Sequence, residues 1–427
     1  MATWVNRQLL AGMVLFFLMV GTKAWGTDPP APDLPTLVQE AVSRNPSIEA
    51  SEAQWQTFLQ KARQAGSFDD PMLMLGISNG LVSDPFAFDQ DGMTSKVIGL
   101  SQKLPFFGKR SLAREAASLE AVSAQARHEE RKLALTALVK EIYARLFLVD
   151  KARDILARNL QVMDAVIGAA ESRYGVGEGR QQDVLRAQVE RSRLRETQIG
   201  LDQQRRSLQA NLNRLLARPA DTPIGRIADL DTPPVPYEAD ELRRLAEEKR
   251  PLLAGLSAQV DKGKAEEALA QKAFYPDFTL SLEYMQREPA MGGEGDDMYS
   301  AAVSFNLPVW RERRQARVAE ANAQQATAQA ELHDLRNAID GGIADLLAKL
   351  DRAGRLLELY RGGILPQSAH AFESAQIAYS NNQVDFSRML NSLTALFNDE
   401  RQIYQTMTDY RLTLAQLEAL VGTDLTK

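Results

Sequence analysis

The sequence predicts a mixed, mainly α-helical chain with a small β component, organised as two internal repeats. Four short motifs recur along the 427 residues at nearly constant offsets of 203 to 205 positions. Between the motifs, long stretches carry apolar residues at three- and four-residue steps, which is the period of an amphipathic helix. Shorter stretches alternate apolar and polar residues, which is the period of a half-buried strand.

The repeated motifs lie in the same order in both halves, which indicates an internal duplication. The matching stretches are Arg44–Ile48 with Lys249–Leu253, Asp70–Leu73 with Tyr275–Phe278, Lys103–Phe107 with Asn306–Trp310, and Arg173–Leu185 with Ala378–Leu390. We therefore expect a first repeat over residues 27–218, a second repeat over residues 239–421 and a C-terminal tail over residues 422–427. The proline-rich residues 219–238 cannot continue a helix and are expected to form a linker.

The N-terminal residues have the pattern of a secretory signal. Arg7 supplies a positive region, Leu9 to Val20 form an apolar run, and Ala24 and Gly26 are small residues at a cleavage-type position. The run is too short to span a bilayer as a helix, so a cleaved signal peptide over residues 1–26 is expected, with a signal anchor as the alternative. The chain has no cysteine, so an exported protein of this sequence must be held by core area or association.

Each repeat is expected to begin with a helix, over residues 34–64 and 239–273, followed by a β-hairpin at about 71–104 and 276–308. In the second hairpin the apolar residues of the first strand are Phe278, Leu280, Leu282 and Tyr284, and the intervening polar residues are Thr279, Ser281 and Glu283. An apolar face toward lipid and a polar face toward a lumen is the pattern of membrane-barrel strands. The strand expected over residues 72–78 is apolar on both faces.

A long helical hairpin is expected to complete each repeat, at about 109–216 and 311–420. The first helix, to about residue 173, has no proline and would be nearly ~100 Å long. The second repeat is expected to be interrupted at Gly362, Gly363 and Pro366. Helices of this length with narrow apolar stripes need coiled-coil neighbours.

Four strands cannot close a membrane barrel, and open edges in hydrocarbon leave backbone groups unpaired. The chain must therefore associate with copies of itself. Three copies would give about 12 strands, enough for an open lumen, and ~100 Å of helix below such a barrel could cross much of the periplasm. The net charge of −6 gives no reason to expect nucleic acid as a partner.

The first hairpin turn has the pattern Arg173-Tyr174-x-x-Gly177 followed by Asp183-x-Leu185-x-Ala187-Gln188, and a Leu-Pro dipeptide follows the second strand of each half. In this order and doubled, these motifs resemble the outer-membrane efflux protein family typified by the channel TolC. The resemblance implies a homotrimer with a 12-stranded transmembrane β-barrel in outer-membrane lipid, continued by a periplasmic α-helical barrel of 12 helices. It also implies a passive conduit that docks on a periplasmic adaptor protein and an inner-membrane efflux pump, often of the resistance-nodulation-division (RND) type.

The stretch from Gln102 to Arg110 is similar to family members associated with heavy-metal efflux, so metal ions are one expected cargo. Drugs and secreted proteins remain open, since in such a system the pump selects the substrate.

By this resemblance the hairpin tips are candidates for docking the adaptor. The tip residues are Arg173, Tyr174, Gly175, Gly177, Asp183, Leu185, Tyr379, Asn382 and Leu390. The alternative interpretation is that they only cap and pack the two hairpins.

The tunnel entrance is expected just past the second turn, at Asp385, Arg388 and Asn391. Some family members have paired acidic residues there, and Arg388 and Asn391 occupy the matching positions here. An acidic ring is thus in doubt, and Asp183 facing Arg388 of a neighbouring copy would instead form a closing ion pair.

No catalytic, cofactor or metal site is expected, because the sequence lacks cysteine, an HExxH motif and a glycine-rich phosphate loop. His128 and His333 could form a ring in the tunnel, although surface histidines are common. Met291 and Met298 could touch soft metal ions, although packing is the simpler interpretation. The main rival function is a soluble periplasmic coiled-coil adaptor of the membrane-fusion type, with one helical hairpin and a β-sandwich.

Overall fold

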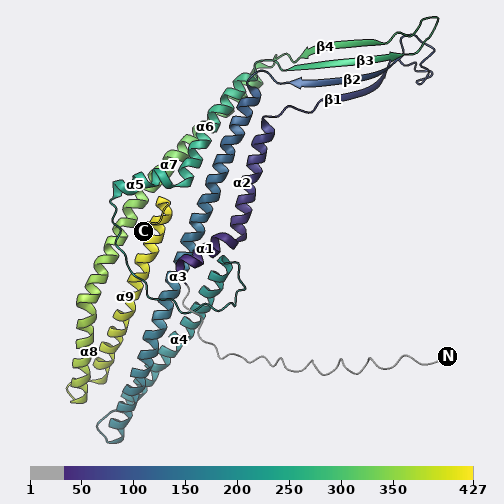
Figure 1. The fold of residues 1–427 in the computed structure, drawn as a ribbon. Helices are drawn as coiled ribbons and strands as arrows, with labels where there is room; N and C mark the ends of the chain where they lie inside the picture. Colours follow the sequence, from purple (N-terminus) through teal and green to yellow (C-terminus); the bar gives the residue numbers. More distant parts are fainter. Residues whose placement is uncertain (1–32, 427) are drawn as a thin grey trace, which may run out of the picture.

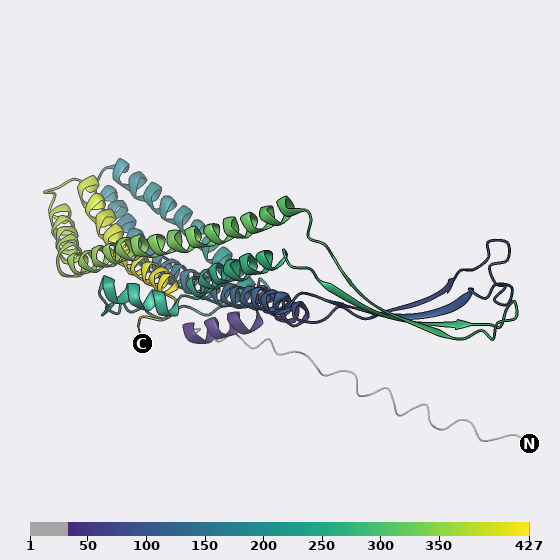
Figure 2. The same cartoon turned by 90° about the horizontal axis from the view of Figure 1, so that it is seen from above.

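The computed structural model describes residues 33–426, so the expected signal peptide lies outside the described part. The chain forms an elongated helical body with a β-sheet projecting from one end and the turns of two helical hairpins at the other (Figure 1). The view from above shows the same separation of sheet and hairpin turns (Figure 2). No helix within residues 33–426 is long and apolar enough to cross a bilayer.

The single helix expected at the start of each repeat is divided in two. The short helices are α1 (Leu34–Arg44), α2 (Pro46–Ala65), α5 (Ala239–Lys249) and α6 (Pro251–Lys272). The dividing residues, Asn45 and Arg250, have extended backbones with ψ of 122° and 114°. Each precedes a proline, whose ring excludes the helical conformation for the residue before it. The expectation of one continuous helix over 34–64 and over 239–273 was therefore wrong.

The long helical hairpins follow the sheet strands in both repeats. They are α3 (Lys109–Gly175) with α4 (Gln181–Leu215), and α7 (Arg311–Leu359), η1 (Tyr360–Ile364) and α8 (Leu365–Ser380) with α9 (Phe386–Val421). The interruption expected near Gly362 and Gly363 is a π-helical turn, η1, and the chain stays helical through it. Pro366 has no amide hydrogen to donate back into this turn, and the π turn accommodates that loss without a break.

The four strands form one antiparallel sheet in the order β1 (Met72–Ser78), β2 (Ser95–Leu104), β3 (Phe278–Arg287) and β4 (Met298–Phe305). The two expected hairpins are thus joined edge to edge through β2 and β3. The pairing register assigns each strand residue to one of two faces. The apolar face contains Leu73, Leu75, Ile77, Ile98, Leu100, Leu280, Leu282, Tyr284, Tyr299, Val303 and Phe305.

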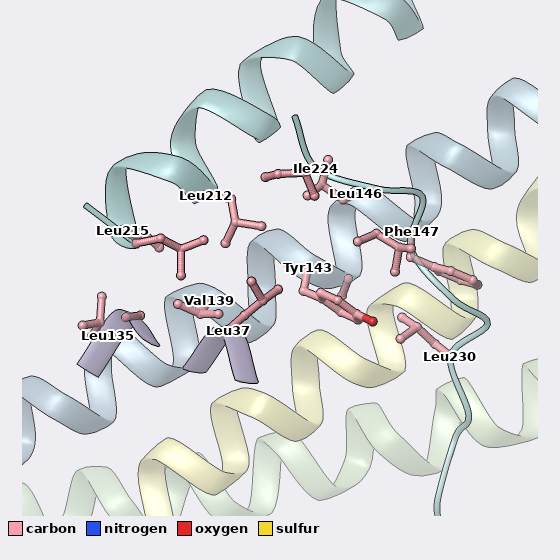
Figure 3. Packing of buried hydrophobic residues seen from close by; sticks show 14 of the residues in the cluster. Leu37, Leu135, Val139, Tyr143, Leu146, Phe147, Leu212, Leu215, Ile224 and Leu230 are labelled. Atoms are coloured by element: carbon pink, nitrogen blue, oxygen red, sulfur yellow. The ribbon is translucent and has the colours of Figure 1, made fainter. Parts of the chain in front are cut away.

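The largest buried cluster lies where the first repeat, the linker and the last helix meet. Figure 3 shows Leu37 of α1, Leu146 and Phe147 of α3, Leu212 of α4 and Leu230 of the linker converging there. Buried Asp150 of α3 accepts hydrogen bonds from Arg205 of α4 (2.8 Å) and from the backbone amide of Ile227 (3.2 Å). The linker is therefore held against the first hairpin.

Candidate functional site

The two hairpin turns have the same backbone geometry although their sequences differ. Gly177 and Asn382 both have left-handed conformations, with φ of 81° and 61°. In the first turn the amides of residues 176, 177 and 178 donate to the carbonyls of residues 172, 174 and 173. In the second turn residues 381, 382 and 383 donate to residues 377, 379 and 378, each 205 positions later. Glycine and asparagine are the residues that adopt this conformation most easily at a helix end.

A small apolar core holds the two tips side by side. The first hairpin contributes Met163, Ile167, Ala170 and Ala187, and the second contributes Phe386, Met389 and Leu393. Leu390 packs on this cluster from the side. The tips are thus one structural unit within a single chain.

Arg173 connects the tips across their surface. Its Nη1 donates to the carbonyl of Tyr379 (2.7 Å), its Nη2 contacts the side-chain oxygen of Asn382, and the guanidinium lies 4.8 Å from the centre of the Tyr379 ring. An arginine can do all this at once because its planar fork offers several donors and stacks on aromatic faces. Three of the residues expected at the tips are therefore in direct contact.

The charges around Tyr379 also couple the tips. Burial raises the pKa of the Tyr379 phenol, Arg173 acts to lower it, and Asp183 of the first hairpin acts to raise it. The ring meets Phe386 edge to face with centroids 5.6 Å apart. The phenol of Tyr379 is therefore influenced by a cation and an anion that both belong to the other hairpin.

Other expected tip residues point to solvent. Tyr174 is 50% exposed and Leu185 is 53% exposed, and Gly175 has open space where a side chain would be. These residues do not pack in the apolar core between the tips, so their surfaces are available to a partner. Leu390, in contrast, packs against that core.

The three expected entrance residues lie at the start of α9. Asp385 caps the helix by accepting a hydrogen bond from the amide of Arg388 (2.8 Å). Asp385, Arg388 and Asn391 are spaced three residues apart, so they share one exposed face of the helix. Among residues 33–426, neither Asp183 nor the Arg388 guanidinium has a salt-bridge partner.

One contact between the tips was missed from the sequence. Arg186 of α4 donates a hydrogen bond to the hydroxyl of Ser387 at the start of α9. The two residues are 201 positions apart, and no periodic or motif signal connects them. Only the offset of 205 that aligns the repeats would have placed both near the tips.

The histidine ring considered from the sequence is not formed by His128. This side chain is 3% exposed, receives or donates a hydrogen bond with Ser51 (2.8 Å) and stacks on Trp55. His333 stands at the matching position and is exposed. Within the described residues, no group of three or more His, Cys, Asp or Glu side chains is placed to hold a metal ion.

Solved structures of outer-membrane proteins share this fold. VceC from the bacterial pathogen Vibrio cholerae is 19% identical over 92% of this chain and 96% of that chain, with a TM-score of 0.77. CusC is 15% identical over 93% and 94%, with a TM-score of 0.79. The outer-membrane channel MtrE of Neisseria gonorrhoeae in its open state is 19% identical over 92% and 90%, with a TM-score of 0.75. No curated protein sequence matches the chain.

The architecture excludes the rival expectation of a periplasmic adaptor, because the chain has two long helical hairpins and one four-stranded sheet. The sequence model of the family described as outer membrane efflux protein matches residues 37–218 and 242–423, which is most of the chain. Both matches begin in the short helices and end after the second helix of a hairpin. The chain belongs to the outer membrane efflux protein family.

Proposed function

We propose that three copies of this outer-membrane channel subunit close a 12-stranded barrel and act as the passive conduit of a tripartite efflux system. The observation that carries the proposal is the sheet itself. It has one apolar face, and its outer strands β1 and β4 both have a free edge in the single chain. In a bilayer those edges must be paired, and the free edges of identical copies can pair with each other.

The helical part supports the same assembly. The exposed face of α4 carries Val189 and Ile199, and α8 contains no buried residue at all. Apolar side chains at such spacing on a long helix require a coiled-coil partner. Neighbouring copies would supply it and would continue the barrel as a helical tunnel.

The tips at the far end would dock a periplasmic adaptor, which connects the tunnel to an inner-membrane pump of the RND type. Exposed Tyr174, Val176 and Leu185 support this assignment, because solvent-facing apolar residues at a turn mark an interaction surface. Asp385, Arg388 and Asn391 would line the tunnel entrance. Metal ions are the proposed cargo, on the similarity of Gln102–Arg110 to metal-efflux members.

The test is assembly and conduction by the full-length protein. Membranes of expressing cells are extracted first with carbonate and then with detergent. The mass of the purified protein is measured by native mass spectrometry. The protein is then reconstituted into planar bilayers to record its conductance. We expect retention until detergent is added, a mass of three chains and discrete conductance steps. A water-soluble monomer would overturn the assembly. A trimer without conductance would overturn the conduit.

Deletion of the gene followed by growth tests addresses the cargo. Sensitivity to silver or copper without sensitivity to dyes and antibiotics is expected. Sensitivity to the organic compounds alone would contradict the metal cargo and leave the channel in place.

A further inference from the structure

All four methionines in the strands lie on the same face of the sheet. The register places Met72 and Met74 of β1 opposite Ser101 and Gly99 of β2, and Met285 of β3 opposite Met298 of β4. Val97, paired with Met285, and Gly99, paired with Glu283, connect the two pairs across β2 and β3. The strand that had two apolar faces in the sequence therefore has a leucine face and a methionine face.

The methionine face is otherwise the polar one. It also contains Ser101, Lys103, Thr279, Ser281, Glu283, Ser300 and Ser304. Met72 is 72% exposed and Met74 is 47% exposed, so these side chains do not fill a core. Met74 covers Gly99, but about half of its side chain and most of the Met72 side chain remain exposed, and the distinctive chemical property of an exposed thioether is that of a soft ligand.

Gly99 lies between Met74 and Glu283 on this face. The methyl carbon of Met74 lies 3.1 Å, and Cγ of Glu283 lies 3.2 Å, from the position that a Cβ at residue 99 would occupy. The Met74 and Glu283 side chains thus flank Gly99, where the central strand has no side chain of its own. In the described part of the chain Glu283 has no ion-pair partner.

Two other charged groups of this face have partners of their own. Lys103 faces Asp69, with 3.8 Å between its Nζ and the carboxylate. The guanidinium of Arg287 contacts the sulfur of Met298, which removes that thioether from the set of free ligands. Around Gly99 this leaves the sulfurs of Met72 and Met74 and the carboxylate of Glu283, while Met285 lies two residues further along β3.

We propose that Met72, Met74 and Glu283 form a binding site for soft monovalent cations, Ag⁺ or Cu⁺, on the wall of the channel. The placement of this face toward the lumen rests on the proposed trimeric barrel. Thioethers select soft cations over Na⁺ or Mg²⁺, and the unpaired carboxylate neutralises the bound charge. Three copies in one barrel would present this site three times at the same height.

The test uses Ag⁺ as the probe, titrated calorimetrically into the purified full-length trimer in a nitrate buffer. The variant Met72→Leu/Met74→Leu keeps apolar volume and removes two sulfurs. Met291→Leu is the matched control, because Met291 lies in the loop between β3 and β4 and is 89% exposed. Glu283→Gln removes the charge alone. Native mass and conductance are measured on every variant.

We expect Ag⁺ binding by the wild-type protein, a loss of affinity of ~10-fold or more in the double variant, and a smaller loss in Glu283→Gln. Met291→Leu should bind as the wild type does, and Mg²⁺ should not compete. A conducting trimer that binds no Ag⁺, or a double variant with unchanged affinity, overturns the site and leaves the proposed channel standing. A monomeric protein without conductance overturns the proposed function, and the lumenal site with it.

Discussion

The side-chain amide of Asn45 donates a hydrogen bond of 2.8 Å to the backbone carbonyl of Leu215, at the end of α4. In the second repeat Arg250 donates from Nη1 to the carbonyl of Leu420, also at 2.8 Å. Both donor and acceptor are displaced by the same 205 positions. Each repeat therefore has an equivalent hydrogen bond between the break in its short helices and the end of its helical hairpin, although a different side chain donates it in each repeat.

Replacing Asn45 by alanine should destabilise the protein. Asn45 is almost fully buried and its oxygen also caps α2 by accepting from the amide of Ser47 (2.9 Å). Losing the cap and the bond to Leu215 should lower the free energy of unfolding by ~1–3 kcal/mol, measured by denaturant titration in detergent. The control Ser43→Ala changes an exposed hydroxyl of α1 and should cost little. Equal effects of the two changes would contradict the structural role of Asn45.

The ion pair between Glu120 of α3 and Lys262 of α6 should make stability depend on pH. Burial raises the pKa of Glu120, but hydrogen bonds from Lys262, Gln259 and Arg127 outweigh it and lower the pKa from 4.5 to about 2. The folded-state pKa is below the unfolded value, so the contribution is present above pH 4.5 and is lost as the pH falls toward 2.

Glu120→Gln should therefore lower the free energy of unfolding near pH 6 by ~1–2 kcal/mol, and the difference from the wild type should shrink between pH 4.5 and 2. Asp345→Asn is the comparison, because Asp345 pairs with Lys349 on an exposed helix surface. Its effect should be smaller at every pH. A Glu120→Gln deficit that stays constant down to pH 3 would speak against the lowered pKa.

Alanine should have opposite effects at Gly177, which is left-handed, and at Gly175, which is not. Gly177→Ala places a Cβ on a residue with φ of 81° and should cost ~1–2 kcal/mol in unfolding free energy. Gly175→Ala, two residues earlier, enters open space at an ordinary φ and should be neutral or slightly stabilising. Asn382→Gly in the other turn should be tolerated. Equal free energies of unfolding for the two alanine variants would show that the positive φ of Gly177 does not require glycine.

Arg173→Met should loosen the two tips from each other. It keeps an apolar stem and removes the donors to Tyr379 and Asn382. A loss of ~1.4 kcal/mol would shift a closed-to-open equilibrium about tenfold, visible as a raised open probability in planar bilayers. Arg193→Met provides the control, because Arg193 pairs only with Glu190 one turn away. An unchanged open probability in Arg173→Met would contradict a role for this contact in channel opening.

The proposed closing pair between Asp183 and Arg388 of a neighbouring copy is tested by charge exchange. Asp183→Ala should increase conductance and antibiotic leakage, by less than Arg173→Met, because exposed ion pairs contribute only ~0.2–1 kcal/mol. Asp183→Arg combined with Arg388→Asp should restore the wild-type behaviour. Unaltered leakage in Asp183→Ala, measured by antibiotic susceptibility, would end this assignment.

Much of this architecture follows from periodicity and repetition in the sequence. The alternation in β3 and the helical spacing in α3 predict elements that the structure contains, because each is dictated by local backbone geometry. The offset of 205 also brings Arg173 and Tyr379 to the same end of the molecule, although their contact depends on packing. Local periodicity does not report which hairpin surfaces meet.

Two features could not be predicted from the sequence, and the reason is physical. The methionine face of β1 could not be recognised, since a strand with apolar residues on both sides has no preferred face until its partner sets the register. The contact of Arg186 with Ser387 joins residues that are distant in the chain, and no residue pattern encodes such a pair. The helix breaks at Asn45 and Arg250 could have been placed from the prolines that follow them.

The π turn at Tyr360–Ile364 adds one residue to a helical revolution that α3 completes without such an insertion. Beyond it every side chain of α8 is rotated by about 100° relative to an uninterrupted α7, since one residue is a little over a quarter of a turn. Removing a single residue from this segment would rotate the surface that α8 presents to α9 and to the adjoining subunit. The length of the helix would stay almost the same. A one-residue deletion should thus change which face of α8 meets its neighbours along the whole helix.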